Sequence, residues 1–199
     1  MSLPIEYINS YKDLCTESFI VEPYRSNGEY HVCLLEKDKN AKLTEVDVYN
    51  VPKDSILLAM HKYSDLAIGD KMKKILKPAS GVFKCCDYVL MSITKDKLHI
   101  VFIELKSMKV DSSEIKKQFK GALCFLDYCQ AIIERFCENP LIRDTKAYSH
   151  YILISANRRI DKRETKVKQN RVQNTSADDF YHIKVGSDKS ISIPFDKLI

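Results

Sequence analysis

The chain has 199 residues, of which 45% are hydrophobic and 30% charged, a composition typical of a globular protein that can bury its own core. Its net charge is +5 at pH 7, and no apolar stretch approaches the roughly 20 residues that cross a bilayer. The N-terminal residues lack the basic start and apolar run of a signal peptide, so we expect a cytoplasmic protein with no membrane partner.

The first fifty residues are predicted to be rich in β-strands. Apolar and β-branched residues dominate the segments 18–24, 30–36 and 43–51. The polar runs between them, RSNGE and KDKNAK, are typical of turns. We therefore predict an N-terminal β meander over residues 1–52, as one part of a single domain that spans residues 1–199.

A helix is predicted after this meander. Asp54 is a suitable N-cap residue, and the spacing of the apolar residues that follow is helical. The pattern predicts a helix over residues 55–76, with a break near Gly69 after which Asp70 begins a second helical piece.

A β-hairpin is predicted at the centre of the chain. The segments 86–93 and 98–106 are apolar and rich in β-branched residues, and the polar sequence TKDK separates them. Two such runs around a short polar turn are typical of neighbouring antiparallel strands.

A symmetric turn places Asp87 directly across from Glu104 at the open end of this hairpin. Their Cβ atoms would lie roughly 4.5–5.5 Å apart on one face, where two like charges repel. A divalent cation is the usual compensator, because Mg²⁺ and Mn²⁺ take carboxylate oxygens as ligands. Lys106 points to the same face, since side chains alternate along a strand.

These residues resemble a known motif. Asp87, followed by Glu104-Leu105-Lys106 at the end of the next strand, is similar to the Asp…(Asp/Glu)-x-Lys signature of the PD-(D/E)xK, or restriction-endonuclease-like, nuclease superfamily. Cys86 stands where the name of the family has Pro. The resemblance implies that Asp87 and Glu104 bind a catalytic Mg²⁺ or Mn²⁺. It also implies that Lys106 orients the attacking water and stabilises charge at the phosphate.

Two further residues resemble parts of the family's site. Gln118 lies in the helix after Lys106, where some members place a supporting Gln, although a Gln on the helix surface is the alternative. Asp70 resembles the acidic residue that many members carry before the hairpin and would join the metal ligands, with Asp65 and His61 as competitors. A favourable interaction with the helix dipole explains Asp70 equally well.

The second half of the chain predicts a long helix and three strands. An amphipathic helix over 110–140 begins at one of the serines of VDSSE and ends at Pro140. A strand is predicted over 147–156, and a terminal hairpin over 179–185 and 190–195. The buried stripe of the helix consists of Ile115, Phe119, Ala122, Leu126, Cys129 and Ile133.

Basic residues concentrate in one segment, 156–173. It holds seven basic and two acidic side chains, an excess equal to the +5 of the whole chain. Such a segment suits contact with a phosphate backbone, while a solvated charged loop is the alternative. The basic side chains are Arg158, Arg159, Lys162, Arg163, Lys166, Lys168 and Arg171.

These patterns predict an α/β (α+β) protein with a restriction-endonuclease-like core. We expect a central mixed sheet flanked by helices, with the core at 53–156 and the basic loop and terminal hairpin at 157–199. The expected function is a metal-dependent nuclease that hydrolyses phosphodiester bonds in nucleic acid, with DNA favoured, in restriction, phage defence or repair, alone or with a protein subunit. The alternative is a catalytically inactive module of the same fold that binds nucleic acid or a protein partner.

Overall fold

The fold is seen in a computed structural model, which describes residues 3–36, 41–62, 84–107, 110–137, 145–156, 175–186 and 189–199. Its helices are α1 (Leu3–Leu14), α4 (Ser112–Phe136) and the short 3₁₀ helix η1 (Phe195–Lys197). One sheet has six strands in the order β1 (Ile20–Val21), β5 (Ile56–Ala59), β6 (Tyr88–Thr94), β7 (Lys97–Lys106), β8 (Ala147–Ala156) and β9 (Tyr181–Val185). The other has four, in the order β10 (Ser190–Pro194), β4 (Glu45–Tyr49), β3 (Glu29–Leu35) and β2 (Tyr24–Ser26).

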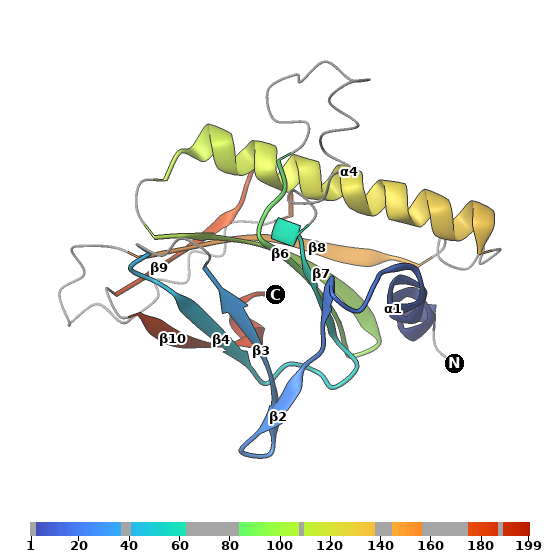
Figure 1. Ribbon diagram of the computed structural model, residues 1–199, viewed down its shortest axis with the longest axis horizontal. Coiled ribbons are helices and arrows are strands. Elements are labelled where there is room, and N and C mark those ends of the chain that lie inside the picture. Colours follow the sequence, from blue (N-terminus) through green and yellow to red (C-terminus); the bar gives the residue numbers. More distant parts are fainter. Residues whose placement is uncertain are drawn as a thin grey trace.

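The six-stranded sheet is mixed and is covered on both faces. The strands β5, β6 and β7 are antiparallel, while β8 and β9 continue the sheet parallel to β7. Helices α1 and α4 cover one face, and the four-stranded sheet covers the other (Figure 1). The expected α+β class and the mixed sheet with helices packed on it are confirmed, and in the described residues these helices lie on one face of the sheet. None of the described helices is both long and apolar enough to cross a membrane.

The two covering layers follow from the sequences of the central strands. On β7, Phe102 packs beneath the helices, and its neighbours Val101 and Ile103 pack between the two sheets. On β8, Leu153 packs beneath the helices and Ile154 packs between the two sheets. Strands that are apolar on both sides must be buried on both sides, so each face needs its own cover.

The predicted central hairpin and its register are confirmed. Strands β6 and β7 pair from Thr94 with Lys97 to Tyr88 with Ile103. The two residues of the turn have positive φ angles of 51° and 59°, which matches the right-handed twist of the flanking strands. Asp87 directly precedes the paired residues of β6, and this register leads to Glu104 as the next residue opposite it.

The helix predicted from residue 55 is wrong at its start. Residues Ile56–Ala59 form β5, all four are buried, and they pair with β6 on one side and β1 on the other. A short apolar run fits a buried strand as well as a helix, so its spacing alone does not decide between them. The remainder of that prediction, residues 63–76, lies outside the described residues.

The N-terminal meander is confirmed for β2, β3 and β4, which are antiparallel neighbours. The predicted strand at 18–24 instead divides between the two sheets, as β1 and β2. Helix α1 was not predicted. It is amphipathic, and the hydroxyl of its buried Tyr11 donates to the carbonyl of Leu126 in α4 over 3.1 Å, which joins the two helices.

Helix α4 confirms the long predicted helix and its buried stripe. Its N-cap is Asp111, rather than one of the serines, because the Asp111 carboxylate accepts from Ser113 N over 2.9 Å. A carboxylate at this position also interacts favourably with the helix dipole. The helix ends at Phe136, earlier than Pro140, which is outside the described residues.

The terminal hairpin is wrong, although both of its strands exist. Strand β9 pairs in parallel with β8 in the six-stranded sheet, and β10 pairs in parallel with β4 in the four-stranded sheet. Ile183 and Ile193 both pack in the apolar layer between the sheets. Each strand buries its apolar side there, which an isolated two-stranded hairpin cannot do.

Candidate active site

Two carboxylates meet where β7 ends. Glu104 is completely buried, with 0% of its surface exposed. Asp87 directly precedes β6, and its Oδ2 accepts a hydrogen bond from Leu105 N over 2.8 Å. This bond holds the Asp87 carboxylate against the end of β7, beside Glu104.

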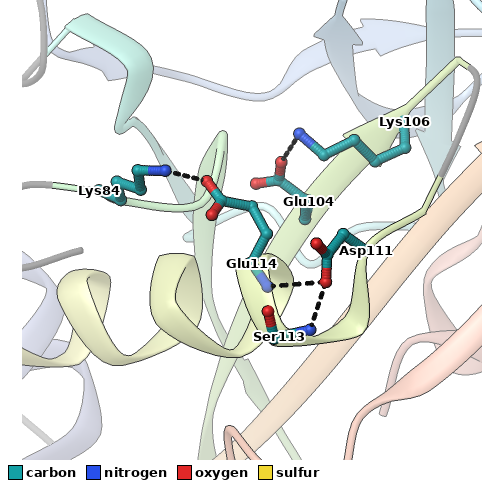
Figure 2. A network of polar contacts seen from close by, with 6 residues as sticks. All are labelled: Lys84, Glu104, Lys106, Asp111, Ser113 and Glu114. Atoms are coloured by element: carbon teal, nitrogen blue, oxygen red, sulfur yellow. Dashed lines mark hydrogen bonds and ion pairs between the residues drawn. The ribbon is translucent and has the colours of Figure 1, made fainter. Parts of the chain in front are cut away.

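Lys106 turns back along β7 toward Glu104, as Figure 2 shows. Its Nζ lies 2.5 Å from Glu104 Oε1. The two residues are two positions apart on a strand and therefore share a face. A cation thus lies against one side of the buried carboxylate.

Gln118 brings α4 into the site. Its backbone carbonyl accepts from Cys86 N over 3.1 Å, and its side-chain amide lies close enough to Glu104 to lower the pKa of that carboxyl. The structure therefore brings together all the predicted catalytic residues, Asp87, Glu104, Lys106 and Gln118. Asp87 directly precedes β6, Glu104 and Lys106 lie at the end of β7, and Gln118 lies on α4, which follows the hairpin in the chain.

The protonation of these groups follows from burial and from their mutual charges. Burial raises the pKa of Glu104, and the charge of Asp87 raises it further. Burial also raises the pKa of Asp87, against the hydrogen bond from Leu105. Burial acts to lower the pKa of Lys106, but the nearby carboxylates outweigh it and raise the pKa. Lys106 is thus a persistent cation beside two carboxyls that are reluctant to ionise.

A third carboxylate, Glu36, was not among the predicted site residues. It directly follows β3, and its charge raises the pKa of both Asp87 and Lys106. The Tyr88 hydroxyl accepts from Leu35 N over 3.0 Å and donates to Leu35 O over 2.9 Å, so the end of β3 is attached to β6. No sequence signal points to Glu36, because its position depends on how the two sheets pack.

Other predicted site residues are placed only in part. Asp70 and its competitor Asp65 lie outside the described residues, as do Arg158, Arg159, Lys162 and Arg163. The other competitor, His61, donates its backbone N–H to Asp87 O over 3.3 Å, and its ring lies edge-on to Tyr88 at 5.3 Å. His61 therefore borders the site through its backbone.

The donor atoms suit a hard divalent cation. In the part of the chain that the structure describes, no three His, Cys, Asp or Glu side chains form a metal-binding group. Both oxygens of Glu104 and the Oε1 of Gln118 are buried there without a hydrogen-bond partner. Oε1 of Glu104 lies against Lys106, which leaves Glu104 Oε2 and Gln118 Oε1 as the oxygens with neither a hydrogen bond nor an ion pair among the described residues. Unsatisfied buried oxygens are costly, and an oxygen-preferring ion would satisfy them.

Three contacts dock the chain before Asp87 onto α4. Lys84 pairs with Glu114 in the first turn of the helix, as Figure 2 shows, and Cys86 N donates to the carbonyl of Gln118. Gly121 lies directly against the backbone of Lys84, since a Cβ there would be 1.7 Å from Lys84 O. The absence of a side chain at this glycine therefore sets how closely Asp87 approaches the helix.

The change Gly121→Ala is expected to destabilise the protein by about 1–3 kcal/mol, because a methyl group cannot share the space of a backbone carbonyl. This outweighs the gain of up to ~1 kcal/mol in helix propensity. Chemical denaturation measures the difference. The matched control, Asp127→Ala on the exposed side of α4, keeps the propensity gain without the close approach. Equal stabilisation by both changes would contradict the tight contact.

The comparisons with known proteins find no match. No protein-family model fits the chain, and neither the curated proteins nor the solved structures contain a significant relative. Any assignment of function therefore depends on the residues of the site itself.

Proposed function

We propose that the protein is a metal-dependent nuclease that hydrolyses phosphodiester bonds in nucleic acid, with DNA the favoured substrate. The proposal depends on one observation above all: Glu104 is fully buried beside Asp87, with Oε1 against Lys106 and with Oε2 lacking a hydrogen-bond partner among the described residues. An arrangement of this kind costs stability in the folded protein. A function explains this loss of stability if the two carboxylates bind a cation.

The order of the elements supports the same proposal. Strands β6 and β7, helix α4 and strand β8 follow one another along the chain. These are the last four elements of the helix, strand, strand, helix, strand order that the resemblance to PD-(D/E)xK nucleases implies; the first helix was predicted over residues 55–76, of which 63–76 lie outside the described residues. Strand β8 lies parallel to β7 and pairs Ser155 with Lys106, so the basic segment that follows Ala156 begins at the edge of the sheet that holds the site.

The residues have distinct roles in this proposal. Asp87 and Glu104 would hold Mg²⁺ or Mn²⁺, and Gln118 would orient Glu104 from the helix. The ion would lower the pKa of a bound water and offset charge on the phosphate. Lys106, held as a cation by its neighbours, would orient the water and stabilise the charge that develops on the phosphate oxygens.

The contact between Lys106 and Glu104 favours a second candidate. This ion pair already offsets the charge of Glu104 without a metal. A catalytically inactive module of the same fold, which binds nucleic acid or a protein partner, would have the same pair. The two candidates differ in whether a divalent cation binds at Glu104.

Incubation with plasmid, linear duplex, single-stranded DNA and RNA, in Mn²⁺ and in EDTA, tests the proposal. We expect cleavage in Mn²⁺ that EDTA abolishes and that Glu104→Gln lacks. The matched control is Glu22→Gln, which removes a carboxylate whose side chain is 71% exposed and lies outside the site. Cleavage by Glu104→Gln at the wild-type rate would contradict the proposed site. Protein that neither cleaves nor binds Mn²⁺ would favour the inactive module.

A further inference from the structure

Three parallel strands end at the same edge of the six-stranded sheet. Lys106 at the end of β7 pairs with Ser155 on β8, and Ser155 pairs with Lys184 on the edge strand β9. Neighbouring strands lie about 4.8 Å apart, so Lys184 is about 10 Å across the sheet from Lys106. The row continues the candidate active site across the sheet.

The side chains of this row share one face. Leu153 packs beneath the helices, and Ser155, two residues later, faces the same way. Ile183 packs between the sheets, so its neighbours His182 and Lys184 point to the opposite, helix-covered face. Glu104 and Lys106 lie on that face as well, because Phe102 in the same strand packs beneath the helices.

Ser155 and His182 form a polar pair beside Lys106. Ser155 Oγ lies 2.7 Å from His182 Nε2, and the serine is 4% exposed. Burial and the charge of Lys184 lower the pKa of His182, so its ring is neutral at neutral pH. When the serine hydroxyl donates to Nε2, the ring proton is on Nδ1, which becomes a hydrogen-bond donor.

Lys184 adds a cation next to this donor. Its side chain is exposed, and among the described residues it has no ion-pair partner. A neutral donor and an unpaired cation on one edge are suited to an anion. The proposed substrate carries an anionic phosphate at every nucleotide, so a chain that reacts at Glu104 presents further phosphates along this edge.

We propose that Ser155, His182 and Lys184 form a second phosphate-binding position, which takes a backbone phosphate beside the one that is cleaved. The inference depends on the proposed nuclease function and adds to it a contact that neither the motif nor the basic segment predicts. Lys184 supplies the charge, His182 supplies a directed hydrogen bond, and Ser155 holds the imidazole in place. The position sets the path of the nucleic acid across β8 and β9.

Equilibrium binding of a labelled duplex and a labelled single strand, in EDTA and at several salt concentrations, tests this inference without cleavage. Lys184→Gln is expected to weaken binding several-fold at low salt. It should also reduce the log–log salt slope by roughly 0.7–0.9, the value for one lost phosphate contact. His182→Gln should weaken binding with little change in slope, since a neutral group is replaced by another neutral group.

The matched control is Lys97→Gln, an exposed lysine at the opposite end of β7. Loss of the same charge there should alter neither affinity nor slope as much as Lys184→Gln does. If the two lysine variants behave alike, the second position is excluded while the nuclease proposal stands. If wild-type protein binds neither nucleic acid at low salt, the inference is overturned, and the Mn²⁺ cleavage assay decides separately whether the nuclease proposal fails with it.

Discussion

The change Lys106→Ala is expected to lower the rate of phosphodiester cleavage by roughly 100-fold or more, the effect of removing one contact that stabilises the transition state. Among the described residues Lys106 is the one cation that forms an ion pair with Glu104, and the surrounding carboxylates keep it protonated. In the proposed mechanism its loss removes the positive charge that stabilises the developing charge on the phosphate. Single-turnover cleavage in Mn²⁺ at saturating substrate measures the effect on chemistry apart from binding.

Two comparisons make this result specific. Lys97→Ala, on the same strand but at its other end, should cleave at the wild-type rate. The double variant Glu104→Ala with Lys106→Ala should be little slower than Glu104→Ala alone, because groups that act as one unit are not additive. Wild-type cleavage by Lys106→Ala, with the fold intact by circular dichroism, would show that any nuclease activity resides elsewhere.

Metal-free wild-type protein is expected to lose stability as the pH rises above about 4.5, the ordinary pKa of a glutamate. The folded state raises the pKa of Asp87 to about 6 and that of Glu104 to about 8, so below these values it holds protons that the unfolded chain has already released. The free energy of unfolding therefore falls as these groups are forced to ionise in the folded protein. Each unit of pKa difference corresponds to about 1.4 kcal/mol, so an overall loss of a few kcal/mol is expected.

The variant Glu104→Gln should remove most of this pH dependence, because a neutral amide of the same shape takes the place of the carboxyl. Urea denaturation in EDTA between pH 5 and pH 8 measures the difference, with Glu22→Gln as the control that keeps the wild-type slope. If the free energy of unfolding of Glu104→Gln falls with pH as steeply as that of the wild type, the raised pKa of Glu104 is contradicted.

Added Mn²⁺ should reverse the loss in wild-type protein. An ion binds the ionised carboxylates, so its apparent affinity should rise with pH as protons are displaced. Stabilisation reaches about 2.7 kcal/mol when the free ion is at 100 times its dissociation constant. Glu104→Gln should show little of this stabilisation. If the protein is the inactive module, Lys106 alone offsets the charge of Glu104. Mn²⁺ should then stabilise neither the wild type nor Glu104→Gln.

Local periodicity determined the parts of the site that lie on single elements. The alternation of apolar residues in β6 and β7, with a two-residue turn between them, was sufficient to oppose Asp87 and Glu104 and to set Lys106 on the same face. The helical spacing of the buried stripe likewise placed Gln118 at the edge of the helix that faces the sheet. These features depend on neighbours within a few residues along the chain or across one turn, so the sequence contains them directly.

Only the tertiary structure decided which distant segments complete the site. The charge of Glu36 acts on Asp87 because the four-stranded sheet packs on the six-stranded one and Tyr88 is hydrogen-bonded to the end of β3. Residues Ile56–Ala59 form a strand because they pair with the edge of β6 that β7 leaves free. Strand β9 pairs with β8 and not with β10. The backbone groups of a short apolar segment can pair with any open strand edge, and the partner is chosen by which arrangement buries the most apolar surface in the assembled protein.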